Sequence, residues 1–341
     1  MKIEAFSEGK NLDAPEANED QFLVLPGRGY AVIDGCSDIT GQLYEGVRAG
    51  WLASRIVLQA LATFLVDPAE RELRPERLIE HLSAAIRAAY VRHGILEIAR
   101  ADPARRFGAT LTLAAELGET FRFVLIGDSG LRIDGTEVFV NDTDLDRVTA
   151  SLRVEAYRLV GEAGGGALDQ ARAGRACAFN GAANLRPEMQ PWLDESKLGL
   201  LYERSLAQCR TRFPRVPEAD IRCLLDTGVS GQTRFQNNTA SPLSYAGLDG
   251  FEIPLPLVRV IDRPRAAIHS IELYTDGYFE PGAAPALDDW EAAFAEVERV
   301  DPEKIGRYPS VKGSSARMNT DDRTVVIVHL QPRALDVRHV P

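Results

Sequence analysis

Short apolar runs alternate with longer segments of helical periodicity in the first half of the chain. The apolar runs have the length of strands, and Gly-containing turns separate several of them, such as Gly-Arg-Gly at 27–29. The longer segments repeat large apolar residues every three or four positions, which is typical of an amphipathic helix. These patterns predict strands at 21–26, 30–35, 109–117 and 120–129, a hairpin at 131–140, and helices at 44–66 and 75–99.

The same two patterns return near the end of the chain. They predict strands at 253–262, 267–277 and 323–330 and a helix at 287–299. Strands and helices therefore come in groups along the sequence and do not alternate one by one. This grouping favours an α+β layered fold with antiparallel sheets over a parallel sheet.

The middle of the chain, residues 141–240, differs in character from both flanking parts. It combines three helical patches with a run of three glycines at 164–166 and a polar stretch. The patches lie at 144–161, 195–213 and 217–226. We interpret the segment as an inserted helical cap on the core, so that residues 1–341 form a single domain.

Composition narrows the class of protein. The 341 residues are 45% hydrophobic and 26% charged, which is ordinary for a globular protein. The formal net charge of -11 disfavours a nucleic-acid partner. Four cysteines without a C-x-x-C pair argue against structural zinc and favour a reducing compartment. We see no apolar run of a signal peptide, and Arg55 and Gln59 interrupt the most apolar segment, so we expect a cytoplasmic protein without a membrane partner. The oligomeric state stays open.

Carboxylates lie beside five of the predicted strands. They are Glu19, Asp34, Asp128, Asp276 and Asp321, in the segments NED, IDG, GDSG, TDG and TDDRT. A single strand-end aspartate before glycine is usually a turn residue. Five such segments instead suggest oxygen ligands that converge, and without an accompanying histidine these suit Mg²⁺ or Mn²⁺. Two ions of this kind can activate a water for in-line attack on phosphorus.

The order of these motifs resembles that of the metal-dependent protein phosphatases of the PPM (type 2C) family. The motifs are NED, AVIDG, a helix pair, GAT, GDSG, YTDG and DDRT. The resemblance covers about residues 17–140 and 245–330 and leaves the inserted segment out. It implies a divergent bacterial-type member with a central antiparallel β-sandwich flanked by helix pairs, in α-β-β-α layers. It also implies two, possibly three, bound Mg²⁺ or Mn²⁺ ions.

The resemblance assigns a role to each side chain. Asp34 would bridge two metal ions, with the carbonyl of Gly35 and the carboxylate of Glu19 on the side of one ion. Asp276 and Asp321 would bind the other ion. Asp34 and Asp276 are therefore the predicted catalytic residues.

Asp128 would hold a third, weaker ion, and Gly108 and Thr110 would pack at a strand start. The family also has an arginine four residues before the glutamate of its acidic pair, where it grips the substrate phosphate. This chain has Pro15 at that position. Lys10, Arg28 or an arginine of the insertion could replace it, and the sequence does not select among them. The candidate arginines of the insertion are Arg172, Arg175, Arg210, Arg212 and Arg234.

The resemblance implies a phosphatase that hydrolyses phosphoserine, phosphothreonine or another phosphate monoester through an activated water at a binuclear Mg/Mn centre. Its substrate would be a phosphoprotein or a small phosphorylated molecule. The alternative is a non-catalytic, metal-binding regulatory module. Pro15 favours this alternative, whereas the retention of every core carboxylate disfavours it.

Overall fold

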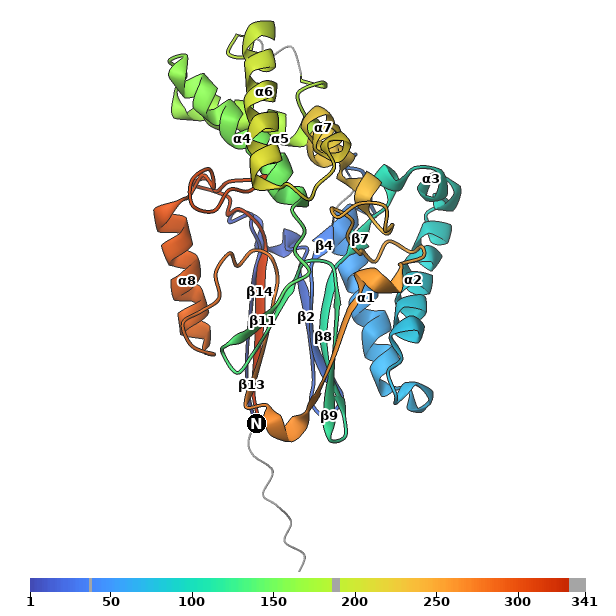
Figure 1. Cartoon of the computed structure of the whole chain (residues 1–341). Coiled ribbons are helices and arrows are strands. Elements are labelled where there is room, and N and C mark those ends of the chain that lie inside the picture. Colours follow the sequence, from blue (N-terminus) through green and yellow to red (C-terminus); the bar gives the residue numbers. More distant parts are fainter. Residues whose placement is uncertain (37–38, 186–190, 331–341) are drawn as a thin grey trace, which may run out of the picture.

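Two antiparallel sheets of five strands each form the centre of the computed structural model, which describes residues 1–36, 39–185 and 191–330 (Figure 1). The first sheet contains, in spatial order, β1 (Lys2–Glu8), β14 (Arg323–His329), β13 (Ser270–Tyr274), β10 (Gly130–Ile133) and β11 (Glu137–Phe139). The second contains β12 (Arg259–Pro264), β9 (Thr120–Ile126), β8 (Leu111–Leu117), β3 (Gly29–Ile33) and β2 (Gln21–Leu25). Two short ladders pair β4 (Gly35–Cys36) with β7 (Gly108–Ala109) and β5 (Leu43–Tyr44) with β6 (Val47–Arg48).

The strands are buried on both faces, and alternate side chains enter different cores. On β3, Tyr30 and Val32 pack between the two sheets, whereas Ala31 and Ile33 face the helices on the outer side. This is the two-residue period of a β-strand. A strand covered on both sides reads as a continuous apolar run, which is why β3 is visible in the sequence.

Helices cover the outer faces of both sheets (Figure 1). α1 (Ala49–Val66) and α2 (Pro75–Arg92) pack on the second sheet, and the short α3 (Leu96–Ala101) follows them. α8 (Leu287–Val300) covers the first sheet through the fully buried Trp290. Among the described residues, α1 is the one helix long and apolar enough to cross a membrane, and ten of its residues are buried.

The inserted segment forms a helical cap at one edge of the sheets (Figure 1). Its helices are α4 (Leu145–Glu162), α5 (Ala167–Asn180), α6 (Glu195–Arg212), α7 (Glu218–Thr227) and the 3-10 helix η5 (Gly228–Phe235). Their apolar faces enclose a hydrophobic cluster separate from the cores of the sheets. Further single-turn 3-10 helices are η1 (Pro15–Ala17), η2 (Pro68–Glu70), η3 (Pro103–Arg105), η6 (Leu255–Leu257) and η7 (Arg265–Ala267).

The predicted α+β class with an antiparallel β-sandwich between helical layers is confirmed, while several element boundaries were wrong. The helix predicted at 44–66 begins at Ala49, because residues 43–48 form the β5–β6 hairpin. The helix predicted at 75–99 breaks at Gly94, which has a positive φ of 67°. The strand predicted at 253–262 begins only at Arg259, since the prolines before it lack the N–H that a ladder needs.

Two elements have no counterpart in the sequence prediction. β1 is an edge strand whose polar and apolar residues mix, so it shows no apolar run. α5 buries only small residues, namely Ala173, Gly174, Cys177 and Ala178. A helix without large apolar positions gives no clear periodic signal.

Candidate active site

The antiparallel topology of the second sheet brings three acidic segments to one edge. β3 runs antiparallel to both β2 and β8, and β9 runs antiparallel to β8. β3 and β9 therefore end at the edge where β2 begins. Asp34 and Asp128 follow the ends of β3 and β9, and Glu19 and Asp20 precede β2.

The first sheet adds two more acidic segments at the same edge. β13 is antiparallel to β14, so its end lies beside the start of β14. Asp276 follows β13, and Asp321 and Asp322 precede β14. The cap lies over this edge of the sandwich (Figure 1).

These carboxylates lie close enough to change one another's protonation. Burial and then the charges of Asp276 and Asp20 raise the pKa of Asp34 well above its ordinary value. Burial and then the charges of Asp321 and Asp128 do the same to the pKa of Asp276. The structure thus brings together Asp34, Asp128, Asp276 and Asp321, as the sequence predicted; their roles as ligands remain predictions.

The glycines that follow two of these aspartates are required by close backbone contacts. A Cβ atom on Gly35 would lie 2.3 Å from the carbonyl oxygen of Gly50 and 2.7 Å from that of Glu19. A Cβ atom on Gly277 would lie 2.1 Å from the carbonyl oxygen of Asp322. The Asp-Gly pairs therefore mark places where another backbone packs directly against the strand end, and not simple turns.

Thr110 connects the segments of Asp34 and Asp128. Its backbone nitrogen donates to the carbonyl oxygen of Asp34 at 2.8 Å, and its hydroxyl lies 2.8 Å from that of Ser129. Both contacts join the end of β3 to the loop after β9. Thr110 is therefore a positioning residue, in line with the predicted packing role.

Lys10 places a positive charge inside the acidic edge. Its ammonium lies 2.9 Å from Asp321 Oδ1, 2.9 Å from Asp322 Oδ2 and 3.3 Å from Glu19 Oε2. Burial alone would lower the pKa of Lys10, but the charges of Asp321, Asp322 and Glu19 raise it above its usual range. Lys10 is thus a charged lysine that is largely enclosed by carboxylates.

Lys312 approaches the same edge from a loop between α8 and β14. Its ammonium donates to Asp321 Oδ2 at 2.5 Å. Both oxygens of Asp321 therefore accept a hydrogen bond from a lysine. Burial alone would raise the pKa of Asp321, yet the charges of Lys312 and Lys10 lower it below its ordinary range.

The donor chemistry of the cluster fits an oxygen-bound divalent cation. Asp34, Asp128 and Asp276 are carboxylates whose pKa values burial raises and the neighbouring acids raise further, a repulsion that a cation would relieve. Asp20 is buried, and its Oδ1 has no hydrogen-bond partner. In the described part of the chain, no three His, Cys, Asp or Glu side chains already surround one point as metal ligands do. Asp321 would have to exchange its lysine contacts to bind an ion.

Lys10 is the one lysine among the predicted replacements for the arginine absent at position 15, and it is at the cluster. Arg28 is at the β2–β3 turn, at the opposite end of β3 from Asp34, and a five-residue strand spans roughly 17 Å. None of the five arginines of the insertion forms a hydrogen bond or ion pair with the described carboxylates of the cluster. Arg210, for example, pairs with Glu218.

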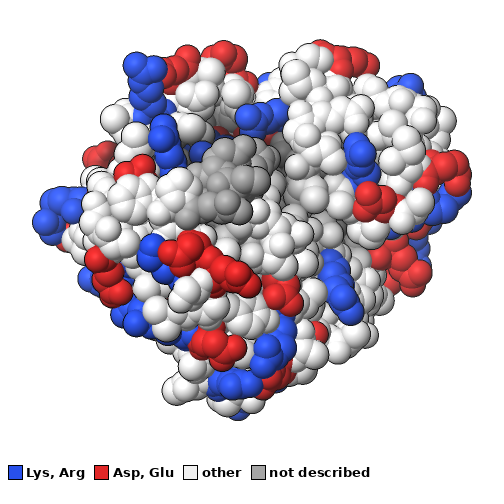
Figure 2. Space-filling view, turned by 90° about the horizontal axis from the view of Figure 1, so that it is seen from above, with Lys and Arg blue, Asp and Glu red and all other residues white. Residues whose placement is uncertain are grey.

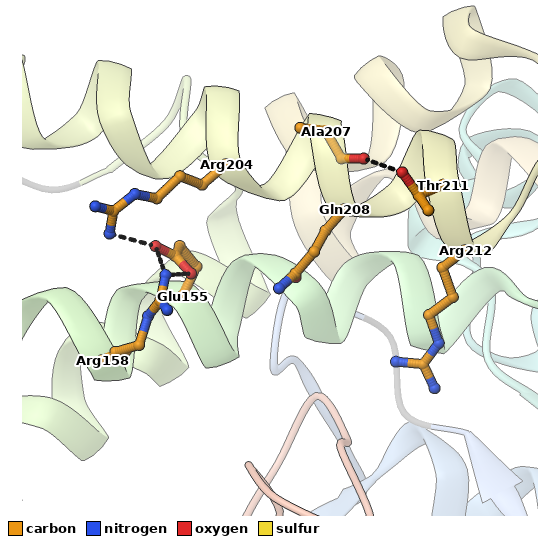
Figure 3. A pocket seen from close by; sticks show the side chains of 7 residues that line it. All are labelled: Glu155, Arg158, Arg204, Ala207, Gln208, Thr211 and Arg212. Atoms are coloured by element: carbon orange, nitrogen blue, oxygen red, sulfur yellow. Dashed lines mark hydrogen bonds and ion pairs between the residues drawn. The ribbon is translucent and has the colours of Figure 1, made fainter.

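A separate pocket lies on the cap between α4 and α6 (Figure 3). Arg158 and Arg204 both point to the buried Glu155, which accepts hydrogen bonds from each (Figure 3). The charges of this pocket therefore neutralise one another. Seen from above, the face that carries the cap shows basic and acidic residues interspersed, with no continuous basic area in the described part (Figure 2).

The site contains residues that the sequence prediction did not single out. Asp20 belongs to the NED motif, and burial and the charge of Asp322 raise its pKa to about 7. Asp146, on α4 of the cap, accepts a hydrogen bond from Gln232 at 2.6 Å and contributes to the raised pKa of Asp128. Lys312 stands in a loop without any recognisable motif. Only Asp20 had a signal, its place beside Glu19.

Comparison with known proteins gives likenesses in structure only. No family model matches the chain, and no curated protein does. The chain is similar to the serine/threonine phosphatase PstP/Ppp of Mycobacterium tuberculosis, with 19% identity, a TM-score of 0.43, and coverage of 97% of this chain and 98% of the other. For the catalytic domain of serine/threonine phosphatase PstP in complex with two manganese ions the values are 17%, 0.44, 96% and 96%.

Stp1 of Staphylococcus aureus, another serine/threonine phosphatase, shows 11% identity and a TM-score of 0.44, with coverage of 97% of this chain and 95% of the other. The structures similar to this chain are thus phosphatases, as the motifs predicted. At these identities and TM-scores the likeness carries no argument about activity. The fold assignment rests on the two sheets described above.

Proposed function

We propose that this protein is a divergent PPM-type phosphatase that hydrolyses phosphate monoesters with the help of Mg²⁺ or Mn²⁺. The observation that carries the proposal is the convergence of Asp34, Asp128 and Asp276 at one edge of the sandwich, with raised pKa values. Buried like charges are costly unless a cation is bound between them. The sequence motifs around these residues support the same reading.

The residues would divide the work as follows. Asp34 and Asp276 would hold the metal ions, with Glu19 and the carbonyl of Gly35 on one side, Asp321 on the other, and Asp128 at a third ion. Bound Mg²⁺ or Mn²⁺ supplies Lewis-acid chemistry and a water of lowered pKa. Asp20, with its buried Oδ1, would orient water beside the ligands.

The substrate would enter on the side of the cap. Asp146 of α4 lies near enough to Asp128 to raise its pKa, so the cap borders the cluster. A phosphoserine or phosphothreonine on a protein is the substrate that the family resemblance suggests. A cytoplasmic location is part of the same proposal and rests on the sequence alone.

Mn²⁺-dependent hydrolysis of p-nitrophenyl phosphate tests the proposal. Wild-type protein should turn over only with Mn²⁺ or Mg²⁺, and Asp34→Asn and Asp276→Asn should each lose at least about 100-fold, more than is typical for a residue behind the ligands. Asp13→Asn, at an exposed aspartate, is the matched control and should behave as wild type. Turnover in excess chelator, or normal turnover in both site variants, would refute the assignment.

The second candidate is a metal-binding regulatory module without turnover. The engagement of both Asp321 oxygens by lysines favours it, because Asp321 is then committed to ion pairs. This candidate predicts Mn²⁺ binding that depends on Asp34 but no hydrolysis of p-nitrophenyl phosphate or a phosphopeptide. Metal-binding and hydrolysis assays on the same protein therefore separate the candidates.

A further inference from the structure

We propose that Lys312 supplies the contact to the substrate phosphate that the arginine absent at position 15 would otherwise make. The inference rests on the proposed function and concerns the same site. It is carried by the place of the Lys312 side chain, which is half exposed and lies against Asp321 at the acidic edge.

The ammonium of Lys312 faces the middle of the cluster. It donates to Asp321 Oδ2 at 2.5 Å, and its charge partly offsets the raised pKa of Asp276 and of Asp146. Lys312 thus lies within electrostatic reach of carboxylates on β13, on β14 and on the cap. A phosphate dianion held by metal ions at Asp34 and Asp276 would meet this ammonium.

Lys10 is less suited to the same task. Its side chain is 18% exposed, against 52% for Lys312, and it contacts three carboxylates. Moving Lys10 toward a substrate would leave Asp322, which is 3% exposed, without its counter-charge. Stranding a buried charge is strongly unfavourable. Lys10 is therefore the fixed counter-ion, and Lys312 is the lysine that can change partners.

The backbone that carries Lys312 is held firmly by a core turn and by the cap. The carboxylate of Asp301 accepts hydrogen bonds from the backbone nitrogens of Ile305, Gly306 and Tyr308. Arg153 of α4 donates to the carbonyl oxygens of Glu303 at 2.7 Å and Lys304 at 3.1 Å.

The contact with Arg153 extends to the residue next to Lys312. A Cβ atom on Gly313 would lie 2.5 Å from Arg153 Nη2. Only the end of the Lys312 side chain is left mobile, while its starting point is fixed. A flexible side chain on a fixed backbone is suited to follow a substrate without disturbing the metal ligands.

The chemistry of the contact is a charge-assisted hydrogen bond. A lysine ammonium has three donors, and among the described residues Asp321 takes one of them. A phosphate oxygen could accept another while Asp321 turns to a metal ion. Such a contact typically changes affinity by about ten- to a hundredfold. Lys312 would then affect phosphate binding and KM more than kcat.

Binding of inorganic phosphate, measured by calorimetry in the presence of Mg²⁺, tests the proposal directly. Lys312→Gln should weaken phosphate binding about tenfold or more, and Lys312→Arg should restore most of it. Lys197→Gln, at a lysine of α6 that pairs with Asp194, is the matched control and should have no effect. Mn²⁺ affinity, followed by electron paramagnetic resonance, should not fall in Lys312→Gln.

Two results would overturn the assignment to Lys312. One is phosphate affinity in Lys312→Gln equal to that of wild type. The other is equal loss of phosphate and Mn²⁺ affinity in both Lys312 variants, which would indicate a structural role. Absence of hydrolysis by the wild-type protein would instead refute the proposed function, and the phosphate measurement would still decide the role of Lys312.

Discussion

Lys10 and Asp322 bind each other through two separate contacts. The backbone nitrogen of Lys10 donates to Asp322 Oδ1 at 2.6 Å, and its ammonium lies 2.9 Å from Asp322 Oδ2. The segment after β1 is thereby fixed to the segment before β14. The second acid of the TDD motif therefore has a local counter-charge and serves the fold.

A double-mutant cycle on this pair should show strong coupling. Lys10→Met leaves Asp322 buried without its counter-charge, so we expect a loss of roughly 3 kcal/mol in the free energy of unfolding. Lys10→Met combined with Asp322→Asn should cost less than the sum of the two single changes, by about 1 kcal/mol or more. Urea denaturation in the presence of a chelator measures all four proteins. Strictly additive losses would show that the two residues do not depend on each other.

Asp34→Asn should have opposite effects on the metal-free and the metal-loaded protein. Without metal, the substitution removes one member of a cluster of like charges, so the melting temperature should rise by about 2–4 °C for each kcal/mol relieved. With Mn²⁺, wild-type protein should be stabilised and the variant should not. Thermal unfolding with chelator and with Mn²⁺ checks both statements. A variant stabilised by Mn²⁺ as much as wild type would contradict the role of Asp34 as a ligand.

The metal-free protein should lose stability as the pH rises. Burial, followed by neighbouring charge, raises the pKa of Asp20 to about 7 and of Asp128 to about 6, so the folded state holds protons that the unfolded chain releases near pH 4. Stability from these groups is complete below about pH 4 and disappears as the pH rises toward 7. Asp321, whose pKa is lowered, has the opposite sign, but it titrates below this range.

Urea midpoints at pH 5 and pH 8 in chelator measure this dependence. The midpoint should be lower at pH 8, and Asp20→Asn should flatten the difference because it removes the carboxyl with the pKa of about 7. A wild-type midpoint that stays constant or rises with pH would show that the cluster is not strained by its own charge.

Gly277→Ala should destabilise the protein, whereas Gly199→Ala should not. The new methyl group at 277 would lie 2.1 Å from the carbonyl oxygen of Asp322, and a backbone contact of this kind typically costs about 1–3 kcal/mol to relieve. Gly199 lies within α6, and a methyl group there would have no heavy atom of another residue within 4 Å, so alanine should add up to about 1 kcal/mol. Denaturant melts of both variants provide the comparison.

The sandwich and most of its strands were predictable from the sequence because burial on two faces leaves a continuous apolar run. β3 and β14 show this plainly, since nearly every residue in them is buried. β1 was missed because its edge position permits a mixed pattern. α5 was missed because its buried stripe consists of small residues.

The candidate site was predictable as far as its acids, and not as to what neutralises them. Each acid follows or precedes an apolar run, and this is a local pattern. Lys10 and Asp322 are 312 positions apart, and nothing near either residue indicates its partner. Lys312 likewise stands in a polar loop, and only the packing of Arg153 against that loop explains its position. Counter-charges are set by tertiary structure, which a local pattern does not contain.

The place of β14 in its sheet also has a consequence for biosynthesis. β14 lies between β1 and β13, and its partner Lys2 on β1 faces His329. A nascent chain therefore cannot join its first strand to the sheet until the last strand has left the ribosome. The acids at positions 321 and 322 arrive at the same late moment. The acidic edge is thus completed in the final stage of translation, and a chain terminated before β14 would expose two unpaired strand edges that promote aggregation.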